Sequence, residues 1–80
     1  MSSDLRNNVN ETLRQVFNSL DGEIDDKWGP DDIKEWDSLG HLNLVMELGE
    51  RFSISIDFEE VMSIETIGDV YILLNNKGVK

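Results

Sequence analysis

The sequence predicts an all-α fold, a small bundle of three main helices plus one short helix, with a long loop between helices 1 and 2. Apolar residues recur at spacings of three and four over 4–20, over 38–52 and again after Thr66. Helix-capping residues stand before these runs. The one alternating segment, residues 53–57, has no partner strand elsewhere in the chain and so cannot form a stable sheet. The 80 residues are expected to form a single domain, 1–80.

Composition and charge exclude several classes of function. The chain has 17 acidic and 7 basic residues and a formal net charge of −10. Nucleic acids and anionic membranes require basic patches, so this chain suits a basic protein partner or divalent cations instead. The absence of cysteine rules out disulfides and thiolate chemistry, and one histidine argues against a dedicated zinc site. No run approaches 18 apolar residues and "MSSDLRNN" is not a signal peptide, so we expect a cytoplasmic protein without membrane insertion. We also expect a monomer.

The first helix is predicted over residues 4–20. Ser2 or Ser3 can cap it, and Asp4 favours the positive N-terminal end of a helix. Its apolar face comprises Leu5, Val9, Leu13, Val16, Phe17 and Leu20.

Residues 21–36, "DGEIDDKWGPDDIKEW", are predicted to form a long loop with a short turn at 31–35. Six acidic residues fall between 21 and 32, and Gly22, Gly29 and Pro30 break any helical pattern. Loops of this length are uncommon in compact domains unless they are functional or flexible. Its two tryptophans are more typical of packing than of an aromatic ligand cage. The expected anchors to the body are Ile24, Trp28, Ile33 and Trp36.

The second helix is predicted over residues 38–52, capped by Asp37 or Ser38. Gly40 lies in its first turn, where a glycine weakens a helix only slightly. Leu44 and Leu48 widen the apolar arc, which indicates packing on more than one neighbour. The principal apolar face is expected to hold Leu39, Leu42, Val45, Met46 and Phe52.

An extended connector, a short helix and a final helix complete the predicted order. Residues 53–57 form the connector, and Asp57 caps one or two helical turns over 57–62. Thr66 and Asp69 stand at the positions of a capping box for the last helix, and Gly78 is suited to end it. The core-facing residues expected on that helix are Ile67, Val70, Tyr71 and Leu74.

Asp37, Ser38 and His41 are the residue types of a serine hydrolase. Ser38 and His41 are three apart and could meet on one helical turn. The orienting acid must, however, lie behind the imidazole while the serine lies in front of it, and adjacent residues cannot readily do both. We therefore expect no catalytic residues, no enzymatic activity and an exposed His41.

A calcium-binding loop is a second alternative. Asp21, Glu23 and Asp25 match the first three ligand positions of an EF-hand loop. The glycine of the sharp turn is replaced by Asp26, and the bidentate glutamate by Asp32. Because both departures remove a geometric requirement, we expect no metal site and a solvated acidic surface.

The segment "EWDSLGHL" decides the functional interpretation together with its surroundings. Asp37-Ser38-Leu39 opens the helix "GHLNLVMELGERF", which is followed by the connector, the acidic short helix and the capped last helix. That succession, the length and the acidity resemble the acyl carrier proteins, including free-standing ones of fatty acid, polyketide and related pathways. The resemblance covers nearly the whole chain.

The resemblance implies a cofactor and partners. Ser38, within the motif Asp37-Ser38-Leu39, matches the serine to which a phosphopantetheinyl transferase attaches 4′-phosphopantetheine from coenzyme A, making a phosphoprotein. Acyl or aminoacyl groups are then attached to the arm as thioesters. Acyl-loading and acyl-processing enzymes with basic docking surfaces are the further partners that it implies. The implied docking residues are Asp37, Leu39, Leu42, Met46, Glu50 and Ile56.

Departures from the family pattern leave an alternative open. Gly40, His41, Asn43 and Gly49 dilute the acidic charge usual on this helix, which suggests partners other than those of a general fatty acid carrier. Glu35-Trp36 stands where peptidyl carriers tend to have a glycine pair. The alternative function is an unmodified, carrier-like acidic protein-interaction module.

Overall fold

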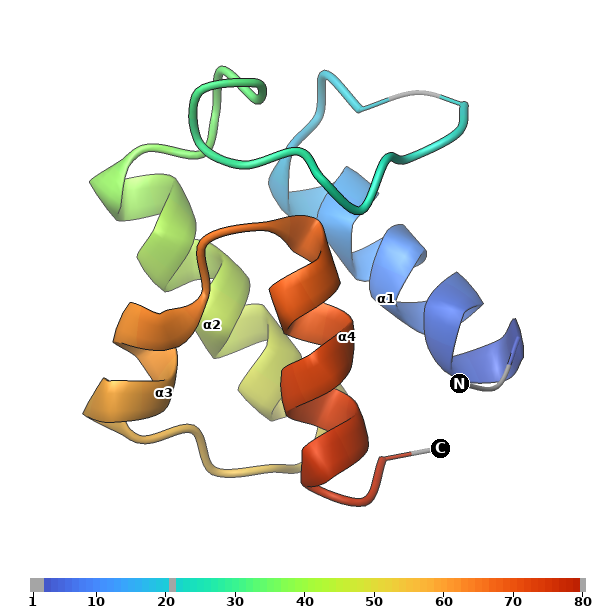
Figure 1. Ribbon diagram of the computed structural model, residues 1–80, viewed down its shortest axis with the longest axis vertical. Coiled ribbons are helices and arrows are strands. Elements are labelled where there is room, and N and C mark those ends of the chain that lie inside the picture. Colours follow the sequence, from blue (N-terminus) through green and yellow to red (C-terminus); the bar gives the residue numbers. More distant parts are fainter. Residues whose placement is uncertain (1–2, 21, 80) are drawn as a thin grey trace.

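The computed structural model describes residues 3–20 and 22–79, which form the predicted all-α bundle (Figure 1). Its helices are α1 (Ser3–Val16), α2 (Ser38–Phe52), α3 (Phe58–Ser63) and α4 (Ile67–Asn76). The long loop crosses one end of the bundle before the chain enters α2 (Figure 1). No helix among the described residues is long and apolar enough to cross a membrane.

Helix α1 ends at Val16, four residues before the predicted boundary. Leu20 N–H bonds to Phe17 O, which closes a tight turn in place of another helical turn. The cause lies across the loop, where the Glu35 carboxylate accepts hydrogen bonds from Ser19 N at 2.8 Å and Ser19 Oγ at 2.5 Å. These bonds hold the pKa of Glu35 below its ordinary value. Ser2 and the side chain of Ser3, the predicted caps, lie outside the part of the chain that is described.

The long loop is held to the bundle by backbone contacts at the start of α4. Asp26 O accepts from Gly68 N at 2.8 Å and Trp28 O accepts from Ile67 N at 2.9 Å. Both N–H groups belong to the first turn of α4 and would otherwise have no partner inside the helix. A Cβ on Gly29 would lie 2.6 Å from Glu65 O, so glycine is required for this approach.

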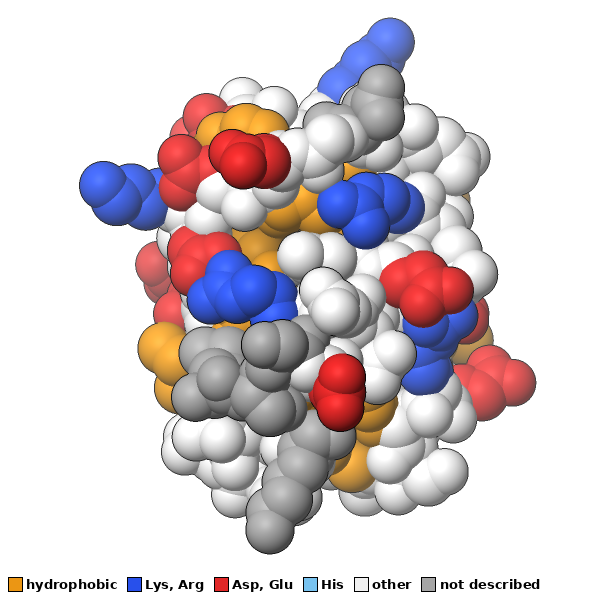
Figure 2. Space-filling model, turned by 90° about the vertical axis from the view of Figure 1, so that its right-hand side faces the viewer, with side chains coloured by type: hydrophobic (Ala, Val, Ile, Leu, Met, Phe, Trp, Pro, Cys, Tyr) orange, Lys and Arg blue, Asp and Glu red, His pale blue; other side chains and the backbone are white. Residues whose placement is uncertain are grey.

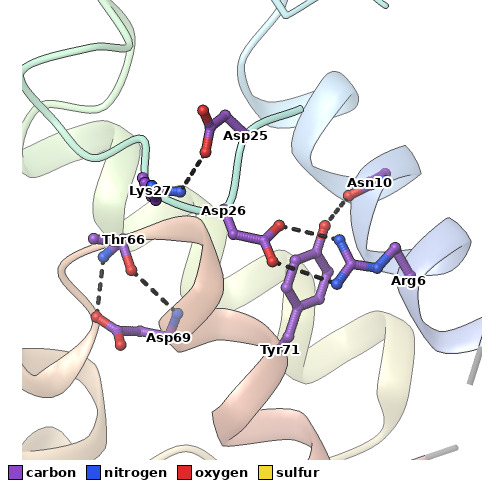
Figure 3. Close-up of polar contacts among 8 residues, drawn as sticks. All are labelled: Arg6, Asn10, Asp25, Asp26, Lys27, Thr66, Asp69 and Tyr71. Carbon is purple, nitrogen blue, oxygen red and sulfur yellow. Dashed lines mark hydrogen bonds and ion pairs between the residues drawn. The ribbon is translucent and has the colours of Figure 1, made fainter. Parts of the chain in front are cut away.

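A polar cluster adds a second link between the loop, α1 and α4 (Figure 3). The Arg6 guanidinium lies 3.0 and 3.3 Å from the two Asp26 oxygens, and 4.5 Å from the centre of the Tyr71 ring. Tyr71 Oη donates a hydrogen bond to Asn10 Oδ1. Burial raises the pKa of Tyr71 above its ordinary value, so the phenol stays protonated as a donor.

The predicted caps of α3 and α4 are confirmed. Asp57 accepts from Glu60 N while the Glu60 side chain accepts from Asp57 N, and Thr66 and Asp69 form the equivalent capping box (Figure 3). Gly78, at φ +82°, ends α4 in a Schellman arrangement with Gly78 N bonded to Asn75 O.

The core lies between α1, α2, α4 and the loop. The prediction of which face of α2 packs against it was wrong. The buried residues of α2 are Gly40, Leu44 and Leu48, whereas Leu39, Leu42 and Met46 are more than half exposed. Of the loop anchors, Ile33 and Trp36 are buried, and Ile24 and Trp28 pack against the core while half-buried. The remaining buried apolar residues are Leu5, Val9, Leu13, Phe17, Ile64, Ile67, Val70, Tyr71, Leu73 and Leu74.

Replacing Ser53 with glycine is expected to stabilise the protein. Ser53 ends α2 with a φ of 54°. Glycine adopts this left-handed backbone conformation without strain, whereas a residue with a side chain is strained in it. We expect Ser53→Gly to raise the free energy of unfolding by about 0.5–1 kcal/mol in urea denaturation. Gly78→Ala, at the other left-handed helix end, should lower it by a similar amount. A loss of stability in Ser53→Gly would contradict this explanation.

Candidate functional site

Ser38 is the first residue of α2, and Asp37 is the cap of that helix. Asp37 Oδ1 accepts from Gly40 N at 2.8 Å, and Asp37 O accepts from His41 N at 2.8 Å. The N–H groups of Ser38 and Leu39 have no hydrogen-bond partner among the described residues, nor does Ser38 Oγ. The serine is exposed. The site therefore presents a free hydroxyl beside two free N–H groups at the positive end of a 15-residue helix.

Gly40 fixes the position of this helix start. A Cβ at residue 40 would lie 1.9 Å from Glu35 O and 3.0 Å from Glu35 C, both of them backbone atoms. The Glu35 carboxylate accepts hydrogen bonds from Ser19, in the turn that follows α1. Glu35 thus links two parts of the chain. Its carboxylate holds the turn after α1, and its carbonyl oxygen lies against Gly40 at the start of α2.

The expectation that His41 is exposed is wrong. The ring is half-buried and both of its nitrogens are engaged. Nδ1 accepts from Trp36 Nε1 at 2.9 Å, and Nε2 lies 2.8 Å from Val61 O in α3. The imidazole plane is nearly parallel to that of Trp36, inclined by 15°, with the ring centres 6.2 Å apart. His41 is therefore a link between the start of α2, the loop and α3.

These contacts also settle the alternative of a serine hydrolase. The Asp37 carboxylate is directed to Gly40 N and not to the imidazole, and neither nitrogen of His41 is available to Ser38. The residue types of a triad are present without the hydrogen bonds that a triad needs.

The acids proposed for a calcium loop make contacts of their own. Asp26 pairs with Arg6, Asp25 Oδ1 accepts from Lys27 N, and Asp32 Oδ2 accepts from Gly29 N. Asp21 lies outside the described residues. Over residues 3–20 and 22–79, no three potential ligands among His, Asp and Glu lie close enough to hold a metal ion.

A cavity of about 580 Å³ opens beside Ser38, between the loop, the start of α2 and the end of α3. Apolar atoms form most of its wall. Its polar lining includes Ser38 itself and the His41 ring. The lining residues are Pro30, Trp36, Asp37, Ser38, His41, Leu42, Met62 and Ile64.

Most of the predicted docking residues lie at the surface of α2. Asp37, Leu39, Leu42, Met46 and Glu50 are exposed, whereas Ile56 is half-buried against the core. Two large exposed apolar residues of α3 were missed, Phe58 at 77% exposure and Met62 at 63%. The sequence could have indicated their exposure. A six-residue acidic helix has few positions that can face the core, so its large apolar residues are expected at the surface.

Most basic side chains belong to other parts of the protein than α2 and α3, and Lys77 at the end of α4 is paired with Glu60 of α3. Figure 2 shows the face on the side of α1, where Lys and Arg side chains are interspersed with acidic ones. Of the basic residues, Arg6 and Arg14 belong to α1, and Arg51, the single base of α2, turns to Glu11 and Gln15 of α1. The exposed surface of α2 and α3 is consequently apolar and acidic.

Acidification is expected to weaken the attachment of α3. The hydrogen bond from Lys77 lowers the pKa of Glu60, with Nζ 2.9 Å from Oε1. A carboxylate with a lowered pKa contributes stability above its ordinary pKa of about 4.3, and the contribution is lost as the pH falls through the folded value. In urea titrations below about pH 5, Glu60→Gln should lose less stability on acidification than the parent. Glu50→Gln, which removes an exposed carboxylate without an ion pair, is the control, and equal slopes for both variants would contradict the prediction.

The sequence and the fold of this chain are similar to those of known proteins. No family model matches the sequence. Over 40 residues the chain is 45% identical to a protein of Caulobacter vibrioides described as "Probable acyl carrier protein". That match covers 50% of this chain and 46% of the relative, so the chain spans less than half of the relative's length.

The likeness in structure extends over almost the whole chain. A solved structure from Mycobacterium tuberculosis, described as "a putative acyl carrier protein", superposes with a TM-score of 0.81 at 29% sequence identity. The superposition covers 91% of this chain and 97% of that one. The chain is therefore similar to acyl carrier proteins, in sequence over half of its length and in fold over nearly all of it.

Proposed function

We propose that this protein carries acyl or aminoacyl groups as thioesters on a 4′-phosphopantetheine arm attached to Ser38. The observation that carries the proposal is the exposed Ser38 hydroxyl, which has no internal partner and stands at the start of a long helix. A phosphopantetheinyl transferase would supply the activation, so the serine needs no base of its own. The family likeness supports a carrier role and not an enzymatic one.

The residues around Ser38 fit a phosphodiester. The free N–H groups of Ser38 and Leu39 can donate to phosphate oxygens, and the helix dipole favours negative charge there. Asp37 is directed into its capping bond with Gly40 N, which leaves these two donors available. The arm itself supplies the thiol, which this cysteine-free chain lacks.

Incubation with coenzyme A, magnesium and a permissive transferase tests the attachment. We expect intact-mass spectrometry to show one added phosphopantetheine in the parent and none in Ser38→Ala. Ser55→Ala, which changes an exposed serine of the connector, is the matched control and should be modified fully. Because Asp37 provides the cap, Ser38→Ala should cost less than about 0.5 kcal/mol of stability and remain folded.

A folded parent protein that no tested transferase modifies would refute the proposal. It would favour the alternative of an unmodified interaction module, in which partner binding survives Ser38→Ala. Intact mass of the protein isolated from its host separates the two functions directly.

We further propose that the exposed surface of α2 and α3 is the docking face for the transferase and for acyl-loading and acyl-processing enzymes. Its apolar residues and its acids suit partners with an apolar patch rimmed by basic residues. The exposed methionines can adapt to several partners. The residues concerned are Asp37, Leu39, Leu42, Met46, Glu50, Ile56, Phe58 and Met62.

Transferase kinetics can test this face. Met46→Ser should lower kcat/KM for modification several-fold, and added salt should weaken the reaction further. Ile72→Ser removes an equally large apolar side chain, 56% exposed on α4, and is the matched control. Equal effects of the two substitutions would count against the docking face. The cargo, whether from fatty acid, polyketide or related biosynthesis, can be read from the native thioester by mass spectrometry.

A further inference from the structure

The hydrogen bonds of His41 fix its protonation state. The Trp36 indole N–H can only donate, so His41 Nδ1 must accept and carries no proton. Val61 O can only accept, so Nε2 must carry the proton and donate. The neutral imidazole with its proton on Nε2 is therefore the one form that satisfies both partners, and it joins buried Trp36 to the backbone of α3.

Helix α3 has few other attachments. None of its six residues is buried, and the side chain that anchors this segment in the core is that of Ile64, the cap at its C-terminal end. Among residues 3–20 and 22–79, its polar links to other elements are the ion pair between Glu60 and Lys77 and the bond from His41 to Val61 O. Within the described part of the chain, the Val61 carbonyl otherwise receives only the 3.4 Å contact from Ile64 N at the end of the helix.

The same histidine forms part of the cavity beside Ser38. His41 follows Ser38 by three residues on α2, and Met62, next to Val61 on α3, also lines the cavity. The bond between His41 and Val61 O therefore joins the two helices, α2 and α3, that contribute to the lining. A change in that bond would move the wall that carries Met62 relative to the serine.

We propose that His41 is a positioning residue that holds α3 against the start of α2 and so determines how large an acyl group the cavity beside Ser38 can cover. This inference rests on the proposed function for its cargo, but the link between His41 and α3 can be measured without it. The apolar wall of Trp36, Leu42, Met62 and Ile64 would cover a short apolar acyl group.

The link itself can be tested on the unmodified protein by hydrogen exchange. His41→Leu keeps a side chain of similar size but removes both bonds, whereas the His41→Gln amide can accept from Trp36 and donate to Val61 O. We expect amides of residues 58–64 to exchange roughly tenfold faster in His41→Leu, as befits the loss of a buried hydrogen bond, with α4 unchanged. In His41→Gln, the exchange rates of the same amides should stay within about threefold of those in the parent. Unchanged exchange over 58–64 in His41→Leu would overturn the inference.

The effect on cargo is tested with the modified protein. The parent and both variants are loaded with straight-chain acyl groups of graded length, and hydroxylamine is used to release each acyl group from its thioester. The parent should protect the shorter groups most, and His41→Leu should shift the best-protected length upward while His41→Gln preserves it. An unchanged length profile in His41→Leu would overturn the control of cargo size. Failure of all three proteins to accept phosphopantetheine would instead refute the proposed function, which the exchange measurement does not require.

Discussion

Gly40→Ala is expected to lower the free energy of unfolding by at least about 2–3 kcal/mol, although alanine is the better helix former. The added methyl carbon would lie 1.9 Å from Glu35 O, and the obstacle is backbone that cannot rotate away. Either residues 35–37 must move outward or the first turn of α2 must unwind. Both responses displace Ser38, so the rate of modification by a transferase should fall as well.

Urea denaturation followed by circular dichroism measures the first effect, and intact-mass kinetics the second. Asn43→Ala is the matched control, because residue 43 is exposed on the same helix and alanine should be neutral or slightly stabilising there. If Gly40→Ala were as stable as Asn43→Ala, the close approach of Glu35 to α2 would not exist in solution.

The elements most accurately predicted from sequence are those fixed by local chemistry. Asp57, Thr66 and Gly78 act within one turn of their own position, so residue type and spacing are enough to place the ends of α3 and α4. The start of α2 follows from Asp37 for the same reason. The location of Ser38 at a helix start was predictable on this basis.

The structural features that could not be predicted from the sequence depend on contacts between residues that are far apart in the chain. The early end of α1 follows from Glu35 bonding to Ser19, sixteen residues away. His41 looked like a surface residue because its partners, Trp36 and Val61 O, come together only when the loop and α3 are in place. No local pattern distinguishes a histidine at the surface from one that bridges two segments.

The dilution of acidic charge at the start of α2 consequently has a structural explanation. Gly40 is required by the approach of Glu35, and His41 by its bonds to Trp36 and α3. Gly40 is buried, and both ring nitrogens of His41 are bonded within the protein, so neither position supplies the acidic charge that is usual on this helix. Differences in partner choice are better sought at the exposed Asn43, Phe58 and Met62.

Trp36→Ala is expected to cost about 3–5 kcal/mol, a large part of the stability that a domain of this size possesses. Trp36 is 2% exposed and stacks on Phe17 with ring centres 5.4 Å apart. Its removal would leave a void between the loop and α1 and would deprive His41 Nδ1 of its donor. We therefore expect the midpoint of unfolding to fall to a much lower urea concentration, with a measurable unfolded population in the absence of denaturant.

Trp28→Ala is the matched control for this prediction, because it deletes the other tryptophan of the same loop. Trp28 is half-buried, and the loop remains attached there through the backbone bond from Ile67 N to Trp28 O. Its loss should cost roughly 1–2 kcal/mol, in proportion to the smaller apolar area removed from water. Trp36→Phe should fall between the two alanine variants, since it keeps an aromatic ring against Phe17 but not the N–H. Equal destabilisation by Trp28→Ala and Trp36→Ala would show that burial of Trp36 is not what holds the loop and the serine beside it in place.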